Sequence, residues 1–229
     1  MITIVGTFAV DHVHRDGEPD VSLPGGPARF ISETLRSLGR QVTIITGIVA
    51  DVNAIAGPNG ETYSIARLPL LPLPAALPGN VVVSPIMREI DAATVPTVGG
   101  FLAVDVQGFV RRPRDEPNLA PDGGLPELLA RAAAVKVAES ELTGLTPQAR
   151  VALNRTVALV TRGSKGLDVR ISGRSHPVAI QSVNVSNVIG AGDILLAAYV
   201  DAALSGLEPL RAARQAAQYT TAALQKRAG

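Results

Sequence analysis

A glycine-rich turn followed at once by an aspartate is the part of the sequence best suited to chemistry. It reads Gly190-Ala191-Gly192-Asp193 and leads into an apolar, Ala-rich segment that begins at Ile194. Small residues let the backbone present its N–H groups where a helix begins, and these groups attract an anion together with the helix dipole. An ionised Asp193 beside a bound phosphate could accept the proton of an attacking hydroxyl. The spacing therefore favours phosphoryl transfer, with Gly190, Ala191 and Gly192 as an anion hole and Asp193 as the base.

The same four residues also suit an ordinary turn between a strand and a helix. Short glycine motifs often occur without a ligand, and Asp is a favoured residue in the first turn of a helix. The motif alone leaves a phosphate site and a structural turn equally open, so the rest of the sequence must decide between them.

Composition excludes several classes of protein. The 229 residues include no Cys, which removes disulfide scaffolds, thiol nucleophiles and Cys-based metal sites. Lys and Arg number 21 against 20 Asp and Glu, and aromatic residues make up 3% of the chain, so the sequence lacks both the basic surface and the stacking residues that a nucleic acid needs. No apolar run reaches the roughly 18 residues of a membrane helix, and the first residues lack the basic start of a signal peptide. We expect a cytoplasmic protein with no nucleic-acid or membrane partner.

Short β-branched runs alternate with Ala- and Leu-rich segments, which is typical of an α/β fold with a parallel sheet. The predicted strands are 2–5, 42–45, 81–83, 101–104, 134–137 and 157–160. The sequence has no internal repeat and no long linker, so one doubly wound, Rossmann-like domain over residues 1–229 is the simplest architecture.

Helices are predicted from apolar periodicity and from the residues that end it. One spans 27–38, with Pro27 at its first position and Gly39 after its end. Two more follow residue 194 and are separated near 205–206. The proline-rich segment 69–78 and the charged segment 111–124 are predicted to be loops.

The glycine-aspartate turn has companions elsewhere in the chain. Gly25-Gly26 precedes the predicted helix, Gly6 and Asp11 accompany the first strand, and residues 160–166 read Val-Thr-Arg-Gly-Ser-Lys-Gly. Taken in their order along the chain, these motifs resemble the ribokinase-like (PfkB) family of sugar and nucleoside kinases. The C-terminal signature of that family fits residues 187–200 nearly position by position.

The resemblance implies a domain of the ribokinase type and a role for each motif. The enzyme would move the γ-phosphoryl of ATP to a hydroxyl of a sugar, a cyclitol or a nucleoside, with Asp193 as base and the 190–192 turn as anion hole. The implied substrate contacts are Asp11, Gly25, Gly26 and Gln107. The implied nucleotide contacts are Thr161, Gly163, Ser164 and Gly166. Glu141 would organise Mg²⁺ and its waters, since this ion needs few protein ligands.

Each role has a structural alternative. Asp11 could be a turn residue after the first strand, Gln107 could satisfy the backbone at a strand end, and Glu141 could be a first-turn residue of the following helix. The arginines within 111–114 could hold a phosphate, but the acids at 115–116 favour a solvated loop.

Several positions depart from the family pattern. Most sugar kinases of the family carry an Asn that contacts the sugar where Phe30 stands. Ala138 replaces the Asn of the usual Asn-x-x-Glu magnesium motif, and Asn187-Val188 replaces an Asp-Thr pair. These changes support a different function, that of a ribokinase-fold protein that binds a nucleotide or a polyol without transferring phosphate. The intact turn at 190–193 argues for the kinase.

The lid and the branch of the family follow from the same resemblance. The segment before Gly25 is too short for the long β lid of ribokinase, so residues 12–24 are predicted to form a truncated lid. Phe30, the run 136–141 and a predicted strand over 105–111 resemble a branch that includes myo-inositol kinases. Since the family often dimerises through its lid, a homodimer is consistent with the resemblance.

Overall fold

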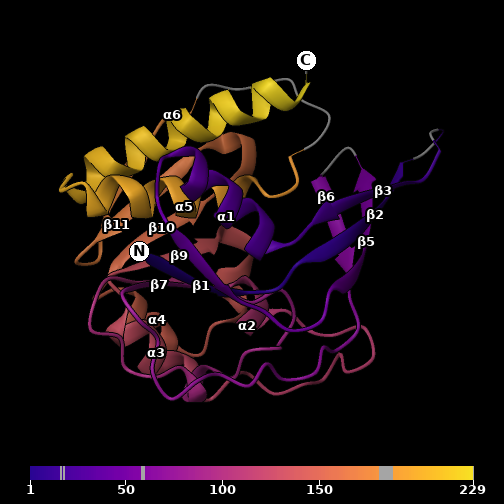
Figure 1. Cartoon of the computed structure of the whole chain (residues 1–229), viewed down its shortest axis with the longest axis horizontal. Helices are drawn as coiled ribbons and strands as arrows, with labels where there is room; N and C mark the ends of the chain where they lie inside the picture. Colours follow the sequence, from indigo (N-terminus) through magenta and orange to yellow (C-terminus); the bar gives the residue numbers. More distant parts are fainter. Residues whose placement is uncertain (16, 18, 58–59, 181–187, 229) are drawn as a thin grey trace.

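A sheet of eight strands lies between two layers of helices (Figure 1). The computed structural model describes residues 1–15, 17, 19–57, 60–180 and 188–228. Within them the strand order is β12-β11-β10-β9-β8-β7-β1-β4, and every pair is parallel except β10–β11 and β11–β12. The strands are β1 (Ile2–Gly6), β4 (Val42–Ile45), β7 (Asn80–Ser84), β8 (Leu102–Asp105), β9 (Ala134–Ala138), β10 (Val157–Thr161), β11 (Leu167–Ile171) and β12 (Arg174–Val178).

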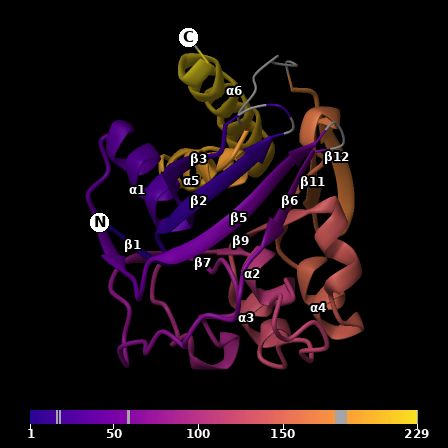
Figure 2. The same ribbon diagram turned by 90° about the vertical axis from the view of Figure 1, so that its right-hand side faces the viewer.

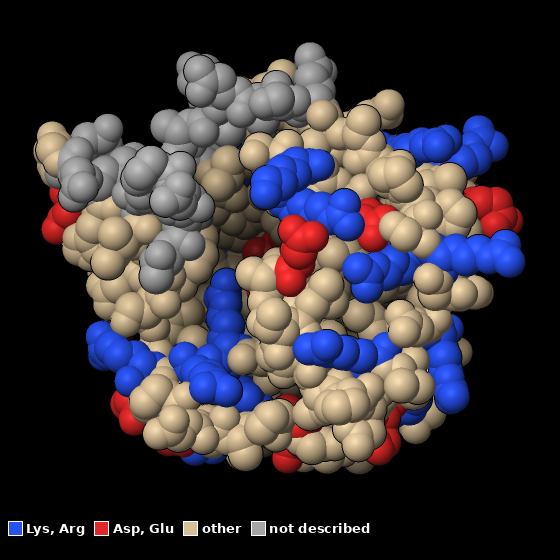
Figure 3. Space-filling view, turned by 180° about the vertical axis from the view of Figure 1, so that it is seen from behind, with Lys and Arg blue, Asp and Glu red and all other residues tan. Residues whose placement is uncertain are grey.

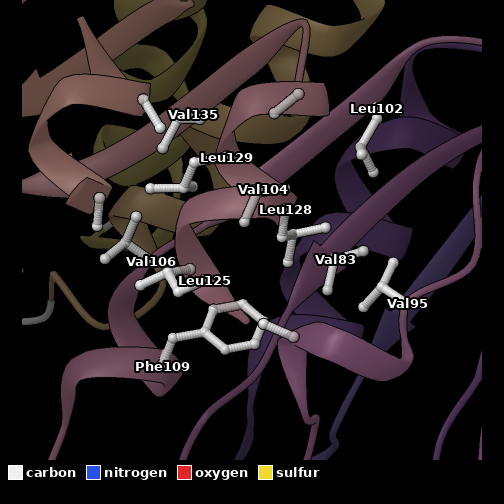
Figure 4. Packing of buried hydrophobic residues seen from close by; sticks show 14 of the residues in the cluster. Val83, Val95, Leu102, Val104, Val106, Phe109, Leu125, Leu128, Leu129 and Val135 are labelled. Atoms are coloured by element: carbon white, nitrogen blue, oxygen red, sulfur yellow. The ribbon is translucent and has the colours of Figure 1, made fainter. Parts of the chain in front are cut away.

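The two helical layers use alternate residues of the same strands. One layer consists of α1 (Pro27–Ser37), α5 (Ala191–Leu204) and α6 (Pro209–Ala228), and the other of α2 (Gln107–Val110), α3 (Leu125–Arg131) and α4 (Pro147–Leu153) (Figure 1). Val82 packs with the first layer, whereas its neighbours Val81 and Val83 pack with the second. Figure 4 shows the apolar cluster on the side of the second layer, whose members include Phe109, Leu128 and Val104 of β8. Burial on both faces explains why these strands are almost wholly apolar.

The predicted doubly wound α/β architecture is confirmed. All six predicted strands form, each within one residue of its predicted bounds, and α1 ends one residue before its predicted end. The break between α5 and α6 includes the predicted 205–206. Short 3-10 helices add η1 (Ala92–Thr94), η2 (Glu139–Gly144) and η3 (Gly163–Lys165).

A second sheet of four strands stands beside the main one (Figure 2). It has the order β3-β2-β5-β6, from β2 (Ala9–Arg15), β3 (Val21–Gly25), β5 (Ala50–Gly57) and β6 (Gly60–Ser64). The predicted lid segment 12–24 therefore holds only half of this sheet. The sequence signal for β5 was weak because it is rich in Ala and contains Asp51 and Asn53, residue types that are depleted in strands.

The strand predicted over 105–111 is wrong, since β8 ends at Asp105 and α2 follows. The Asp105 carboxylate accepts the backbone N–H of Gln107 at 3.0 Å, which turns the chain out of the sheet. Gly108 permits the turn, because a Cβ there would lie 2.4 Å from the Pro85 carbonyl. This local bond replaces the ladder partners that a strand would have needed.

The junction between β3 and α1 depends on a glycine. Gly26 has φ +87 and ψ 154, and a Cβ there would lie 2.5 Å from the Thr7 carbonyl oxygen. The chain thus enters α1 by passing directly over the segment that joins β1 to β2. Pro27 follows at the first helical position, where its missing N–H costs nothing.

We expect Gly26→Ala to lower the free energy of unfolding by roughly 3 kcal/mol, because it adds a backbone collision to an unfavourable φ. Gly39→Ala is the matched control, since Gly39 has φ +80 but nothing within 4 Å of an added Cβ, and its loss should be about 1 kcal/mol. Urea denaturation of both variants measures the difference. Equal losses would show that the close approach at Gly26 contributes nothing.

Candidate active site

Four polar side chains meet at the carboxyl ends of the central strands, beneath the start of α5. Ser84 and Asp105 end β7 and β8, Lys136 projects from β9, and Asp193 lies in the first turn of α5. The Lys136 ammonium donates to both oxygens of Asp105 at 3.2 Å. The Ser84 hydroxyl lies 3.5 Å from an oxygen of Asp105 and 3.5 Å from an oxygen of Asp193. All four side chains are buried.

Charge is unbalanced in this group, because one ammonium faces two carboxyl groups. Burial, followed by the neighbouring charge of Asp105, raises the pKa of Asp193 to about 7, while Lys136 and Arg111 oppose the shift. Burial by itself would lower the pKa of Lys136, but the carboxylates around it raise that pKa above its usual value. Lys136 therefore stays charged, and Asp193 exchanges its proton near neutral pH.

The glycine-rich turn covers this group. Gly190 has φ +78 and forms the N-cap of α5 without a side-chain cap, and the Ile194 N–H closes the first helical turn on its carbonyl at 2.9 Å. The Ala191 N–H donates to the Val188 carbonyl at 3.0 Å. The N–H groups of Gly192 and Asp193 have no preceding helical turn to receive them, so they point out of the helix start.

Lys136 lies directly under the same turn. A Cβ on Gly192 would lie 2.9 Å from Cε and 3.0 Å from Nζ of Lys136, so only glycine fits here without displacing the lysine. The buried Lys136 ammonium, the start of α5 and the Asp193 carboxyl group, whose pKa is about 7, thus lie next to one another. Figure 3 shows a hollow between the second sheet and the body of the molecule, with an acidic side chain at its bottom and basic side chains at its rim.

Comparison with known proteins identifies the family. The sequence profile of the pfkB family carbohydrate kinases matches residues 106–229, which is more than half of the chain. The chain belongs to the pfkB family. The expected family is therefore confirmed, and as a member the chain is a carbohydrate kinase, a phosphotransferase with an alcohol acceptor. No curated protein matches the sequence.

Solved structures of the ribokinase family resemble this pfkB protein over nearly its whole length. A pyrophosphate-dependent kinase complexed with a pyrophosphate analog and myo-inositol is 20% identical with a TM-score of 0.78, over 98% of this chain and 95% of that chain. A ribokinase from Thermotoga maritima is 15% identical with a TM-score of 0.68, over 97% and 92% of the two chains. An aminoimidazole riboside kinase from Salmonella enterica is 17% identical with a TM-score of 0.64, over 97% and 93%. At these identities the likeness establishes the fold.

The three candidate substrate residues near the N-terminus lie together. Asp11 is buried on the inner face of the second sheet, and its carboxylate fills the space beside Gly25, where a Cβ would lie 1.8 Å from Oδ2. On β2 the inward residues are Ala9, Asp11 and Val13, so Asp11 is the polar one among them. Asp11 is not a turn residue after the first strand, because it lies within β2.

Gln107 and Glu141 have backbone roles. Gln107 begins α2, and its N–H is bound by Asp105. Oε2 of Glu141 accepts the Ala138 N–H at 2.7 Å, as a first-turn residue of η2 does. Among the described residues, no group of three or more His, Cys, Asp or Glu side chains could hold a metal ion. Mg²⁺ carried by phosphates needs only one or two carboxylates, and the Mg²⁺ contact of Glu141 stays a prediction.

The candidate nucleotide residues form the tight loop between β10 and β11. Thr161 ends β10 beside Ala138 of β9, which brings the loop next to η2. Gly163 and Gly166 have φ +57 and +108, and the Arg162 N–H donates to the Gly166 carbonyl at 2.9 Å. Ser164 lies between them, exposed. The loop and the 190–193 turn thus lie at the same edge of the main sheet.

Sequence reasoning missed Ser84, Asp105, Lys136 and Arg111 as members of the site. The signal for Lys136 was present, because a lysine inside the apolar strand Ala134–Ala138 must be buried and paired. Arg111 was assigned to a solvated loop, but its guanidinium lies 5.0 Å from the centre of the Tyr63 ring and its charge reaches Asp193.

Asn187 of the family signature lies outside the described residues. In the described part of the chain, no helix is long and apolar enough to cross a membrane.

We expect Lys136→Met to lower the free energy of unfolding by about 3 kcal/mol at pH 7, because it leaves the Asp105 carboxylate buried without its charged partner. The double variant Lys136→Met, Asp105→Leu removes both charges and should recover most of that loss. Urea denaturation at pH 7 and pH 5 provides the measurement. The loss in the single variant should shrink at pH 5, where an unpaired Asp105 takes up a proton. Equal losses in both variants would contradict the importance of the ion pair.

Proposed function

We propose that this enzyme transfers the γ-phosphoryl group of ATP to a hydroxyl of a sugar, a cyclitol or a nucleoside, with Asp193 as the general base. The observation that carries the proposal is the buried Asp193 carboxylate at the start of α5, with a pKa of about 7. A base of that pKa accepts a proton efficiently at neutral pH. The N–H groups of Gly192 and Asp193, which point out of the start of α5, would stabilise the transferred charge.

The acceptor would lie between the second sheet and the turn. Asp11 would hold its hydroxyls, and Gly25, Gly26 and Gln107 would line the approach. The reacting hydroxyl would then donate its proton to Asp193 as its oxygen attacks phosphorus in line with the leaving group. Phosphoryl transfer passes through a loose transition state, so positioning and charge supply most of the rate.

The donor phosphates would lie over the loop that holds Thr161, Gly163, Ser164 and Gly166, with the ammonium of Lys136 beneath the turn. Mg²⁺ bound with the donor would neutralise phosphate charge, and Glu141 would hold it through Oε1 and ordered water. A cavity of about 180 Å³ between the end of β12 and α6 would take the adenine. Its lining residues are Ala179, Ile180, Ala217, Gln218, Thr221, Ala222 and Gln225.

Pyrophosphate is a second candidate donor. The likeness to a pyrophosphate-dependent kinase complexed with myo-inositol, at a TM-score of 0.78, favours this donor and also favours a cyclitol acceptor. Both donors present a terminal phosphoryl group to the same turn. They differ in the need for the cavity beside α6, which pyrophosphate would leave empty.

The first experiment measures ADP or phosphate release with Mg²⁺ and either ATP or pyrophosphate, across myo-inositol, ribose, fructose, adenosine and cytidine. We expect turnover with one acceptor and at least a roughly 1,000-fold loss of kcat in Asp193→Asn, which keeps the shape of the side chain but cannot take the proton. Binding of ATP by calorimetry without turnover on any acceptor would favour the non-catalytic binding protein. Turnover that survives in Asp193→Asn would remove Asp193 as the base.

The pH dependence tests the same base independently. Because only ionised Asp193 can accept a proton, kcat/KM should rise with pH and level off above an apparent pKa near 7. The Ser84 hydrogen bond lowers the pKa of Asp193, so Ser84→Ala should move the profile to higher pH. A flat profile between pH 5 and pH 8 would contradict the assignment.

A further inference from the structure

We propose that Arg227, in the last turn of α6, is a positioning residue that holds the 189–193 turn in its anion-binding conformation. The Phe30 ring of α1 contacts both the Arg227 guanidinium and Gly190, so the restraint also acts through this ring. The inference rests on the proposed function for its consequence in catalysis, but not for its structural part. Figure 1 shows α6 crossing the molecule with its C-terminal end toward the second sheet.

Arg227 contacts both the turn and the Phe30 ring that packs against it. Its Nη1 donates to the Ile189 carbonyl oxygen at 3.2 Å, and its guanidinium carbon lies 4.8 Å from the centre of the Phe30 ring. On the turn itself, a Cβ added to Gly190 would lie 2.4 Å from Cδ2 of Phe30. The guanidinium, the ring and the Gly190 backbone therefore form one continuous contact.

The turn needs support from outside because it has little of its own. Gly190 caps α5 without a side-chain hydrogen bond and holds φ +78, a conformation that glycine enters and leaves easily. The ring of Phe30 blocks movement on one side, and the bond from Arg227 fixes the carbonyl just before Gly190. A shift of about 1 Å in such donors costs roughly 100-fold in rate.

The packing of Phe30 against the turn supports this role. The ring is 6% exposed and packs in one apolar cluster with Ile189 and Ile194 around the turn and with Val13 and Ala54 of the second sheet. An apolar ring cannot form the hydrogen bond to an acceptor hydroxyl that an Asn at this position would form. The departure from Asn at this position thus replaces a polar contact with a packing contact to the turn.

Of the two arginines near the Phe30 ring, Arg227 is the one that holds it. Arg29 also lies near Phe30, at 5.7 Å, but it is paired with Glu33 at 2.8 Å. Burial lowers the pKa of Arg227, and the charge of Glu33 opposes this shift. The charge of Arg29 lowers the pKa further, and Tyr219 raises it. A lysine could carry the charge of Arg227 but could not stack a planar group on the ring while donating to Ile189.

The test compares Arg227→Ala, Arg227→Lys and Arg214→Ala. Arg214 is the matched control, because both arginines are exposed on α6 and the loss of either removes one positive charge. We expect Arg227→Ala to lower kcat by about 10- to 100-fold with an unchanged KM for the acceptor, and low concentrations of guanidinium ion to restore part of it. Arg227→Lys should remain impaired, and Arg214→Ala should match the wild type.

Amide hydrogen exchange gives a second readout that needs no activity. The amides of residues 189–193 should exchange roughly tenfold faster in Arg227→Ala and unchanged in Arg214→Ala. Wild-type exchange and wild-type kcat in Arg227→Ala would overturn the proposal, as would equal effects in the two alanine variants. If the wild-type protein transfers no phosphoryl group, the proposed function fails, and the exchange result still decides whether Arg227 holds the turn.

Discussion

The site depends on the burial of two carboxyl groups beside a single ammonium. Removing charges from water is costly, and the charge of Asp105 is offset by Lys136, which donates to both of its oxygens. Burial, followed by the negative charge of Asp105, raises the pKa of Asp193 toward neutrality, and Lys136 opposes this shift only in part. The strand ends, the start of α5 and the close approach at Gly192 hold Asp105, Lys136 and Asp193 together and bury them.

Much of the fold could be predicted because it follows from local patterns. The apolar strands have no other stable place than between two helical layers, and residues such as Pro27 and Gly39 mark the bounds of α1. The second sheet was harder, since strands such as β5 gain their stability from pairing with β2 over a long separation in sequence. Nothing local distinguishes Asp51 or Asn53 in a strand from the same residues in a loop.

The candidate site could be predicted where one segment carries it, and not where several segments meet. Asp193 and its turn are contiguous, so the sequence displays their chemistry. Ser84 and Asp105 belong to different strands and become neighbours only in the sheet, and the support from Arg227 comes from the far end of another helix. The Glu141 side chain illustrates a third case, since the sequence allowed both a capping bond and a magnesium contact, and the structure shows the bond to Ala138.

The strand order also determines when the site can exist during folding. β1 lies between β4 and β7, so the first strand is not enclosed on both sides until residues 80–84 have paired with it. Ser84, Asp105, Lys136 and Asp193 come from four segments spread over more than a hundred residues. Such long loop closures are slow, and a chain that has folded only its N-terminal half holds strands without the buried ion pair. The acid-base group therefore cannot be complete until α5, which carries Asp193, has docked on the sheet.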